Sequence, residues 1–289
     1  MKGIAAIGGI PLHVVIAFNT FLDVLMGCTS GTAPLGRTGE ILHFRSLDWE
    51  MEELRPLVIQ VEFIRSGSLV ARAVTYAGYT GILTGVRRQL SISLNYRAHR
   101  SNRPISMRLH QFLVLLGFRR SISSVLRDYL LSPGPPLSLD ALRSTLPAIP
   151  TSACYLTFSD GKSSLILEKD LDTAVVRESL DGFIVTTNLD DAIHALSEEE
   201  IEEYIKTQLT FEGEKWLITN SKERRCVIED AWRKGKGATL KTLMEWMKTW
   251  PVKNEFTHFA CVMSPSTGSL LWVKRWERPP RPPKGAKIE

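Results

Sequence analysis

A cysteine, an arginine and an aspartate occur at spacings that could form a reactive site near the N-terminus. Cys28 precedes a short turn, and Arg45 and Asp48 lie in the apolar run that follows it. The apolar runs on both sides of residues 36–39 predict the two strands of a hairpin. Residues equidistant from the turn face each other in an antiparallel pair, which places Cys28 opposite residues 45–48. We therefore expect a thiol, a guanidinium and a carboxylate to converge at one end of a sheet.

These residue types fit a self-activating amidase. A thiol has a reference pKa of about 8.5, and a neighbouring cation such as Arg45 favours its thiolate. Cleavage of the Gly27–Cys28 bond would free an α-amino group with a reference pKa of roughly 7.7–8.0, which can take the thiol proton and later protonate the leaving amine. Asp48 would orient that amine, and Gly27, without a Cβ, tolerates a strained backbone. On spacing alone, a buried structural cysteine and a surface ion pair explain the same residues.

Four short stretches carry a more specific signal. In order, they are Gly27-Cys28-Thr29-Ser30, His43-x-Arg45-x-x-Asp48, Tyr76-Ala77-Gly78-Tyr79-Thr80-Gly81-Ile82-Leu83-Thr84-Gly85 and Ser91-Ile92-Ser93-Leu94-Asn95. In order and spacing they resemble the acid ceramidase and N-acylethanolamine acid amidase family, whose members are N-terminal-nucleophile hydrolases of the choloylglycine hydrolase-like superfamily. The resemblance implies an α+β fold, an αββα four-layer sandwich with two stacked, mainly antiparallel sheets. It also implies autocleavage between Gly27 and Cys28, with Cys28 as the nucleophile.

The resemblance extends to two further site residues. The stretch 187–190 resembles the family's Thr-Asn-x-Asp element, and a carboxamide at a strand end can donate a hydrogen bond to a developing oxyanion. This role is therefore implied for Asn188, although an asparagine in a turn is the local alternative. The stretch 223–225 resembles the family's acidic-Arg-Arg element, which makes Arg224 a second candidate active-site arginine. The gap between Asn188 and Arg224 is longer than in the lipid amidases.

Asn95 and Tyr96 are candidates for substrate binding. Tyr96 stands where the lipid amidases have a glutamate, as in some relatives similar to penicillin V acylase. The resemblance implies a thioester at Cys28 and a linear N-acyl amide substrate such as a ceramide or an N-acylethanolamine, with no metal or cofactor. Two alternatives stay open. In the first, the chain is a catalytically silent lipid- or membrane-binding relative. In the second, it is a penicillin V acylase-like amidase that acts on a non-lipid amide.

The charged residues are unevenly distributed along the chain. The chain has 44% hydrophobic and 23% charged residues and a net charge of +5, a composition that is ordinary for a globular protein. Nine arginines lie between Arg87 and Arg127 with no lysine, aspartate or glutamate among them. Such a stretch could contact anionic lipid headgroups or nucleic-acid phosphates, or simply be solvated. Because no nucleic-acid-binding module accompanies it, we expect an anionic membrane surface and no nucleic acid.

Residues 106–131 are predicted to form two helices. The first has an apolar run that is too short to span a bilayer, and it is followed by Arg119 and Arg120. A helix of this kind either packs in the core or lies at a lipid interface. We expect core packing, because large apolar side chains are usually buried. The apolar residues concerned are Leu109, Phe112, Leu113, Leu115 and Leu116.

Three segments are expected along the chain. Residues 1–27 are a propeptide remnant, because polar residues interrupt any signal-peptide core. Residues 28–277 form the catalytic domain, and residues 278–289 form a basic, Pro-rich tail that is extended. The four cysteines show no disulfide or metal-ligand spacing, and the chain has no Asn-x-Ser/Thr site. As written, the sequence indicates a cytoplasmic location, with a lysosome or vacuole as the alternative if the N-terminus is truncated.

Overall fold

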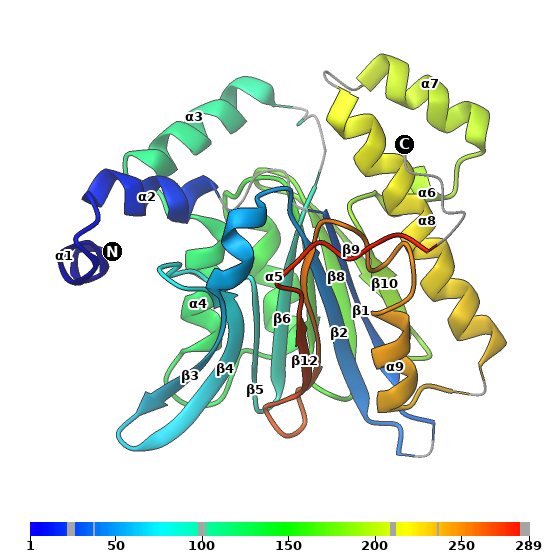
Figure 1. The fold of residues 1–289 in the computed structure, drawn as a ribbon, viewed down its shortest axis with the longest axis horizontal. Helices are drawn as coiled ribbons and strands as arrows, with labels where there is room; N and C mark the ends of the chain where they lie inside the picture. The colour runs from blue at the N-terminus through cyan, green and yellow to red at the C-terminus, as the bar shows by residue number, and fades with distance from the viewer. Residues whose placement is uncertain are drawn as a thin grey trace.

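Two antiparallel β-sheets stack on each other with helices outside them (Figure 1). The computed structural model describes residues 1–21, 27–36, 38–97, 101, 103–208, 212–235 and 237–283. One sheet has five strands in the order β10-β1-β2-β11-β12, and the other has seven strands in the order β3-β4-β5-β6-β7-β8-β9. The predicted α+β sandwich with two stacked antiparallel sheets is confirmed.

The five-stranded sheet contains the predicted hairpin. Its strands are β1 (Gly27–Pro34), β2 (Ile41–Asp48), β10 (Ile184–Thr186), β11 (Thr257–Ser264) and β12 (Ser269–Arg275). Gly27 pairs with Asp48, Cys28 with Leu47 and Ser30 with Arg45. The pairing deduced from equal distances to the turn is therefore confirmed. β1 and β2 are buried along almost their whole length because both faces of this sheet are covered.

The seven-stranded sheet is a meander of consecutive strands. They are β3 (Val58–Arg65), β4 (Ser68–Tyr76), β5 (Thr84–Arg87), β6 (Leu90–Tyr96), β7 (Cys154–Ser159), β8 (Ser164–Lys169) and β9 (Ala174–Glu178). The next strand, β10, does not continue this meander. β10 crosses to the other sheet and pairs with β1, whose edge would otherwise be unpaired.

Helices cover the outer faces of both sheets. On the five-stranded sheet, α8 (Glu212–Lys234) and α9 (Leu240–Trp246) pack through buried residues such as Ile228 and Leu243. On the seven-stranded sheet, α4 (Ile122–Leu130) and α5 (Leu139–Thr145) bury Leu126, Leu130 and Leu142. The remaining short elements are η1 (Glu52–Leu57), η2 (Leu146–Ala148), α6 (Asp191–His194) and α7 (Glu198–Gln208).

Of two N-terminal helices, the second lies against α3 (Pro104–Leu115) at one end of the sandwich and the first packs on the second (Figure 1). These helices are α1 (Lys2–Gly8) and α2 (Leu12–Phe21). The predicted core packing of the α3 segment is wrong: Leu109, Phe112, Leu115 and Leu116 are 53–56% exposed. The helix buries only Met107 and His110, because it lies beyond the sheets and contacts α2. Among the described residues, no helix is long and apolar enough to cross a membrane.

Much of the arginine-rich stretch has internal partners. Arg97 is buried in an ion pair with Asp190, and Arg87 donates hydrogen bonds to backbone carbonyls that follow α4. Arg103 and Arg120 pair with nearby aspartates, whereas Arg100 lies outside the described residues. The stretch is therefore not one uniform cationic face.

Candidate active site

Cys28 lies at the beginning of β1 with its side chain fully buried. Arg45 Nη2 donates a hydrogen bond to Cys28 Sγ over 3.4 Å. Burial raises the pKa of the Cys28 thiol above its usual value, and Arg45 opposes that rise most strongly. A hydrogen bond with the Tyr96 backbone also lowers this pKa. In the uncut chain the nucleophile is therefore an enclosed thiol next to a guanidinium.

A buried asparagine and a serine fix Arg45. Asn95 Oδ1 accepts a hydrogen bond from Arg45 Nη1 (2.7 Å) and another from Ser30 Oγ (2.6 Å). Asn95 Nδ2 donates to the carbonyl of Thr187, the residue that follows β10. Both polar atoms of the Asn95 side chain thus hold the site together, so its contacts support a positioning role. A direct contact between Asn95 and substrate stays a prediction.

Asn188 contacts the nitrogen of Cys28. The backbone N–H of Cys28 donates to Asn188 Oδ1 over 2.7 Å, and Arg224 Nη2 donates to the same oxygen over 2.9 Å. Because both partners are donors, the oxygen of the carboxamide must face them. Asn188 Nδ2 donates to the backbone carbonyl of Tyr96. The oxyanion role of Asn188 stays a prediction, and so does a substrate contact by the Tyr96 phenol.

Arg224 reaches the site from α8 and is fully buried. Its Nη1 donates to the carbonyl oxygen of Cys28 and to Thr29 Oγ1, and it lies 3.7 Å from Asp48 Oδ2. Burial lowers the pKa of Arg224, whereas Asp48 raises it. The long gap after Asn188 holds α6, α7 and the first turns of α8, and it still delivers this arginine to Cys28.

Asp48 lies beside the peptide bond that precedes Cys28. It pairs across the sheet with Gly27, where an added Cβ would lie 3.1 Å from Asp48 Cβ. Burial raises the pKa of Asp48, and Arg224 together with hydrogen bonds from Thr257 and Asn254 lowers it. Sequence reasoning missed Thr257 and Asn254, because no motif marks them and they lie more than 200 residues further along the chain.

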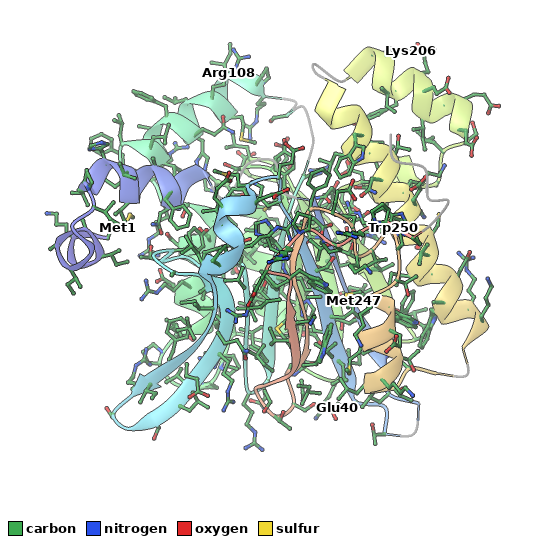
Figure 2. All side chains as sticks on the ribbon, viewed as in Figure 1. Met1, Glu40, Arg108, Lys206, Met247 and Trp250 are labelled. Carbon is green, nitrogen blue, oxygen red and sulfur yellow. The ribbon has the colours of Figure 1, made fainter. Side chains whose placement is uncertain are left out.

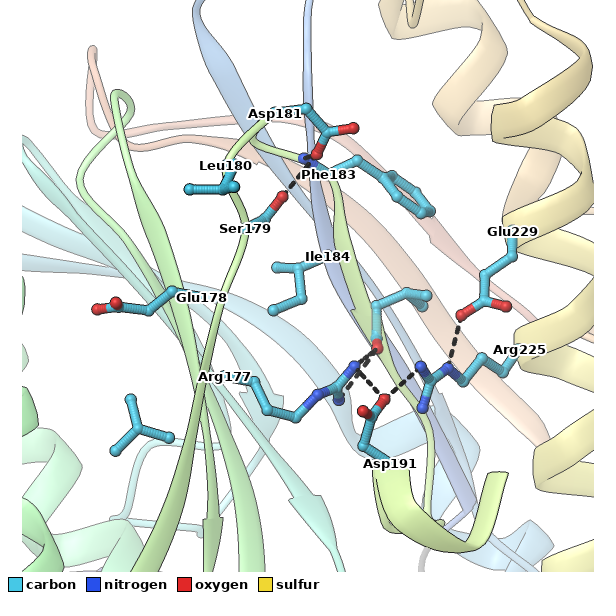
Figure 3. Close-up of a pocket in the computed structure, with 12 residues that line it drawn as sticks. Arg177, Glu178, Ser179, Leu180, Asp181, Phe183, Ile184, Asp191, Arg225 and Glu229 are labelled. Atoms are coloured by element: carbon cyan, nitrogen blue, oxygen red, sulfur yellow. Dashed lines mark hydrogen bonds and ion pairs between the residues drawn. The ribbon is translucent and has the colours of Figure 1, made fainter. Parts of the chain in front are cut away.

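Ion pairs hold the loop that carries Asn188 on both sides. Asp190 accepts two hydrogen bonds from Arg97 and one from the hydroxyl of Tyr155. Asp191 pairs with Arg177 and Arg225 at the floor of a hollow of about 740 Å³ between β9, β10 and α8 (Figure 3). In the Arg224-Arg225 pair, one arginine therefore contacts Cys28 and the other fixes the loop of Asn188.

The described residues contain no group of histidine, cysteine and carboxylate side chains that could hold a metal ion. All four cysteines are free. The site is thus built from one thiol, two arginines, one carboxylate and two carboxamides: Cys28, Arg45, Arg224, Asp48, Asn95 and Asn188. The structure brings all of these predicted residues together.

Comparison with known proteins identifies relatives over most of the chain. No family model matches it. It is 28% identical over 282 residues to an N-acylethanolamine-hydrolyzing acid amidase of Caenorhabditis elegans, with 92% of this chain and 71% of that protein covered. The solved structure of the nematode ortholog is similar, with a TM-score of 0.63 and 26% identity over 83% of this chain and 93% of the other.

A second group of relatives matches a shorter region. Acid ceramidases of rat and human are each 38% identical over 112 residues, which is 34% of this chain. The match spans only 28% of the length of each of these enzymes. Both groups of relatives are amide hydrolases by name, and together they confirm the resemblance that the four motifs indicated.

Proposed function

We propose that this chain, which is similar to N-acylethanolamine-hydrolyzing acid amidase and acid ceramidases, is a self-processing cysteine amidase of their family. One observation carries the proposal: the sulfur and the backbone nitrogen of Cys28 each have a buried polar side-chain partner. Arg45 binds the sulfur and Asn188 binds the nitrogen. A structural cysteine needs neither contact.

Maturation would cut the chain between Gly27 and Cys28. Residues 1–27 then act as the propeptide, residues 28–277 as the catalytic domain and residues 278–289 as a tail; residues 22–26 and 284–289 lie outside the described part of the chain. The N-terminal segment is anchored by Asn19, whose side chain exchanges hydrogen bonds with Gly78 and Thr80. Cys28 is fully buried in the uncut chain, and cleavage is the step that would open it to substrate.

After cleavage, the new α-amino group of Cys28 takes the thiol proton. The thiolate forms a bond to the substrate carbonyl carbon, and Asn188 and a backbone N–H stabilise the oxyanion. The carbon–nitrogen bond then breaks, and the α-amino group returns the proton to the departing amine. Water hydrolyses the resulting thioester. Arg45 lowers the pKa of the Cys28 thiol. The Asp48–Arg224 ion pair lies next to the α-amino group and would orient it.

We propose a fatty acyl amide as the substrate, since the relatives are named for N-acylethanolamines and ceramide. The outer side of α3 supports presentation of such a substrate from a lipid surface. Figure 2 shows Arg108 pointing outward from this helix. Arg119 and Arg120 follow this helix and are exposed, with Arg120 paired to Asp128. The exposed apolar residues of this segment are Ile105, Leu109, Phe112, Leu115, Leu116 and Phe118.

A substrate panel tests the amidase proposal. The processed protein is incubated with N-acylethanolamines, a ceramide and a phenoxyacetyl amide, and release of the amine is measured. We expect turnover of a fatty acyl amide, none by Cys28→Ala, and an acyl adduct on Cys28 in acid-quenched samples. Activity retained by Cys28→Ala would overturn the proposal. Preference for the phenoxyacetyl amide would overturn the lipid assignment alone, and processing without turnover would identify a silent relative.

Vesicle binding tests the lipid-facing role of α3. We expect the protein to co-sediment with phosphatidylserine-containing vesicles and Phe112→Ser with Leu116→Ser to reduce the bound fraction. Ile64→Ser is the matched control, since Ile64 is an exposed apolar residue on β3. Equal loss in the control, or no binding by the wild-type protein, would contradict this role.

A further inference from the structure

Two side chains outside the predicted site bind the carboxylate of Asp48. Thr257 Oγ1 donates to Asp48 Oδ1 over 2.7 Å, and Asn254 Nδ2 donates to Asp48 Oδ2 over 3.1 Å. All three side chains are almost fully buried. Each carboxylate oxygen therefore has its own side-chain donor within the buried site.

Asn254 and Thr257 belong to the turn of residues 254–257, which leads into β11. Hydrogen bonds within this turn fix the directions of the two contacts to Asp48. Thr257 Oγ1 accepts from the backbone N–H of Asn254, so its hydroxyl hydrogen is directed to Asp48. Asn254 Oδ1 accepts from the backbone N–H of Phe256, so the amide Nδ2 faces Asp48. Two donors facing two oxygens suit an ionised carboxylate, which only accepts, better than a carboxylic acid, which must donate.

The turn is held firmly in place. The guanidinium of Arg55 donates to the backbone carbonyls of Thr257 and Glu255. The pairing of β11 with β2 contains an irregularity at His258: Thr257 pairs with Asp48, and Phe259 already pairs with Leu47. An extra residue of this kind redirects side chains at the end of a strand. It leaves Thr257 directly opposite Asp48, on the side of β2 that faces away from Gly27 of β1.

We propose that Thr257 and Asn254 are positioning residues that keep Asp48 ionised and turned toward the Gly27–Cys28 bond. The inference rests on the proposed function, because Asp48 then stabilises the ammonium group that cleavage produces. Ionisation of Asp48 needs this support, because burial opposes it. The other charged or titratable groups that act on Asp48 are Cys28 of β1, Arg45 of β2, Arg224 of α8, Arg55 of η1 and Tyr76 of β4.

The test compares Thr257→Val, which removes the donor, with Thr257→Ser, which keeps it. We expect Thr257→Val to slow self-processing by about tenfold or more below neutral pH, the loss expected for one hydrogen bond to a charged group. The rate should recover toward higher pH, where Asp48 ionises without help. Thr257→Ser and the exposed Thr249→Val should follow the wild-type profile. A Thr257→Val profile that matches the wild type would overturn the inference.

A second readout does not depend on activity. Carboxyl ¹³C NMR of aspartate-labelled protein, with Asp48 assigned from Asp48→Asn, reports the ionisation of Asp48 directly. We expect the pKa of Asp48 to rise in Thr257→Val and, should that variant not fold, in Asn254→Ala. An unchanged titration contradicts the inference even if the wild-type protein processes itself. A wild-type protein that never processes contradicts the proposed function, and the titration still decides the state of Asp48.

Discussion

Asn188 Oδ1 lies 2.7 Å from the backbone nitrogen of Cys28, the atom that cleavage would turn into the catalytic amine. Arg224 binds the same oxygen, and it also binds the carbonyl of Cys28. The amide on each side of the Cys28 α-carbon is therefore fixed before any bond is cut. This pre-organisation lets the same side chains serve self-processing and, later, amide hydrolysis.

Substitution of Asn188 separates its two contacts. Asn188→Ala should slow hydrolysis by roughly 10²–10³-fold, as expected for loss of one oxyanion donor. Asn188→Asp keeps an acceptor for the Cys28 nitrogen but loses the Nδ2 donor. We expect it to process itself and then hydrolyse poorly, as measured by intact mass and amine release. Full hydrolysis by Asn188→Asp would contradict an oxyanion role.

Removal of the Arg45 charge should make the thiol a weaker nucleophile. Arg45 lowers the pKa of Cys28, so Arg45→Met should raise that pKa further. The pH profile for alkylation of processed protein by iodoacetamide should then move to higher pH. Arg45→Lys retains the charge but cannot donate to Asn95 and to Cys28 Sγ at the same time in the geometry of a guanidinium. Its alkylation profile should therefore move less than that of Arg45→Met. Identical profiles in all three proteins would show that Arg45 does not tune the thiol.

A methyl group at Gly27 should hinder processing. In Gly27→Ala the new Cβ would lie 3.1 Å from Asp48 Cβ and 3.4 Å from Asp48 Oδ2, which crowds the carboxylate beside the scissile bond. We expect full-length protein to persist in mass spectra over times at which the wild type is cut. Gly3→Ala is the control, because its added Cβ meets nothing within 4 Å. Wild-type processing by Gly27→Ala would refute this steric requirement.

Two buried histidines should make the fold less stable in acid. Burial lowers the pKa of His43 and of His258 to about 3, while an unfolded histidine titrates near 6.5. Between these values the unfolded chain binds protons that the folded chain does not, so stability falls as pH falls from about 6.5 toward 3. Each histidine contributes up to ~1.4 kcal/mol per pH unit.

Thermal unfolding at a series of pH values measures this effect. His43 hydrogen-bonds Ser91 and Ser93 through its two ring nitrogens, and His43→Gln keeps a polar group there without a titratable ring. On acidification, the Tm of His43→Gln should fall by less than the Tm of the wild type, whatever the Tm of the variant at neutral pH. Parallel curves would mean that His43 is protonated in the folded state.

Local patterns were enough to predict the hairpin, the family and the sandwich. Residues equidistant from one turn determine the register of β1 and β2, so Cys28, Arg45 and Asp48 could be placed from sequence alone. The exposure of α3 could not be predicted, because an apolar helix looks the same whether another element covers it or not. The strand with which β10 pairs could not be predicted either, because its pairing with β1 depends on which sheet edge is unoccupied in the folded chain.

Contacts across long separations were also missed. Thr257 and Asn254 contact Asp48 from a turn that carries no recognisable motif. Arg97 belongs to a stretch that we expected to be solvated or lipid-facing, yet it pairs with Asp190 next to Asn188. Each of these contacts is determined by tertiary packing rather than by neighbouring residues, which is why the sequence pattern does not reveal it.

Intact-mass measurement of the purified chain tests the central claim most directly. The wild-type protein should yield a species that begins at Cys28 together with the fragment of residues 1–27, and Cys28→Ala should remain a single full-length chain. Amine release from a fatty acyl amide should rise in step with the cut species. An uncut chain that still hydrolyses amides would contradict the account, since the catalytic amine would then never form.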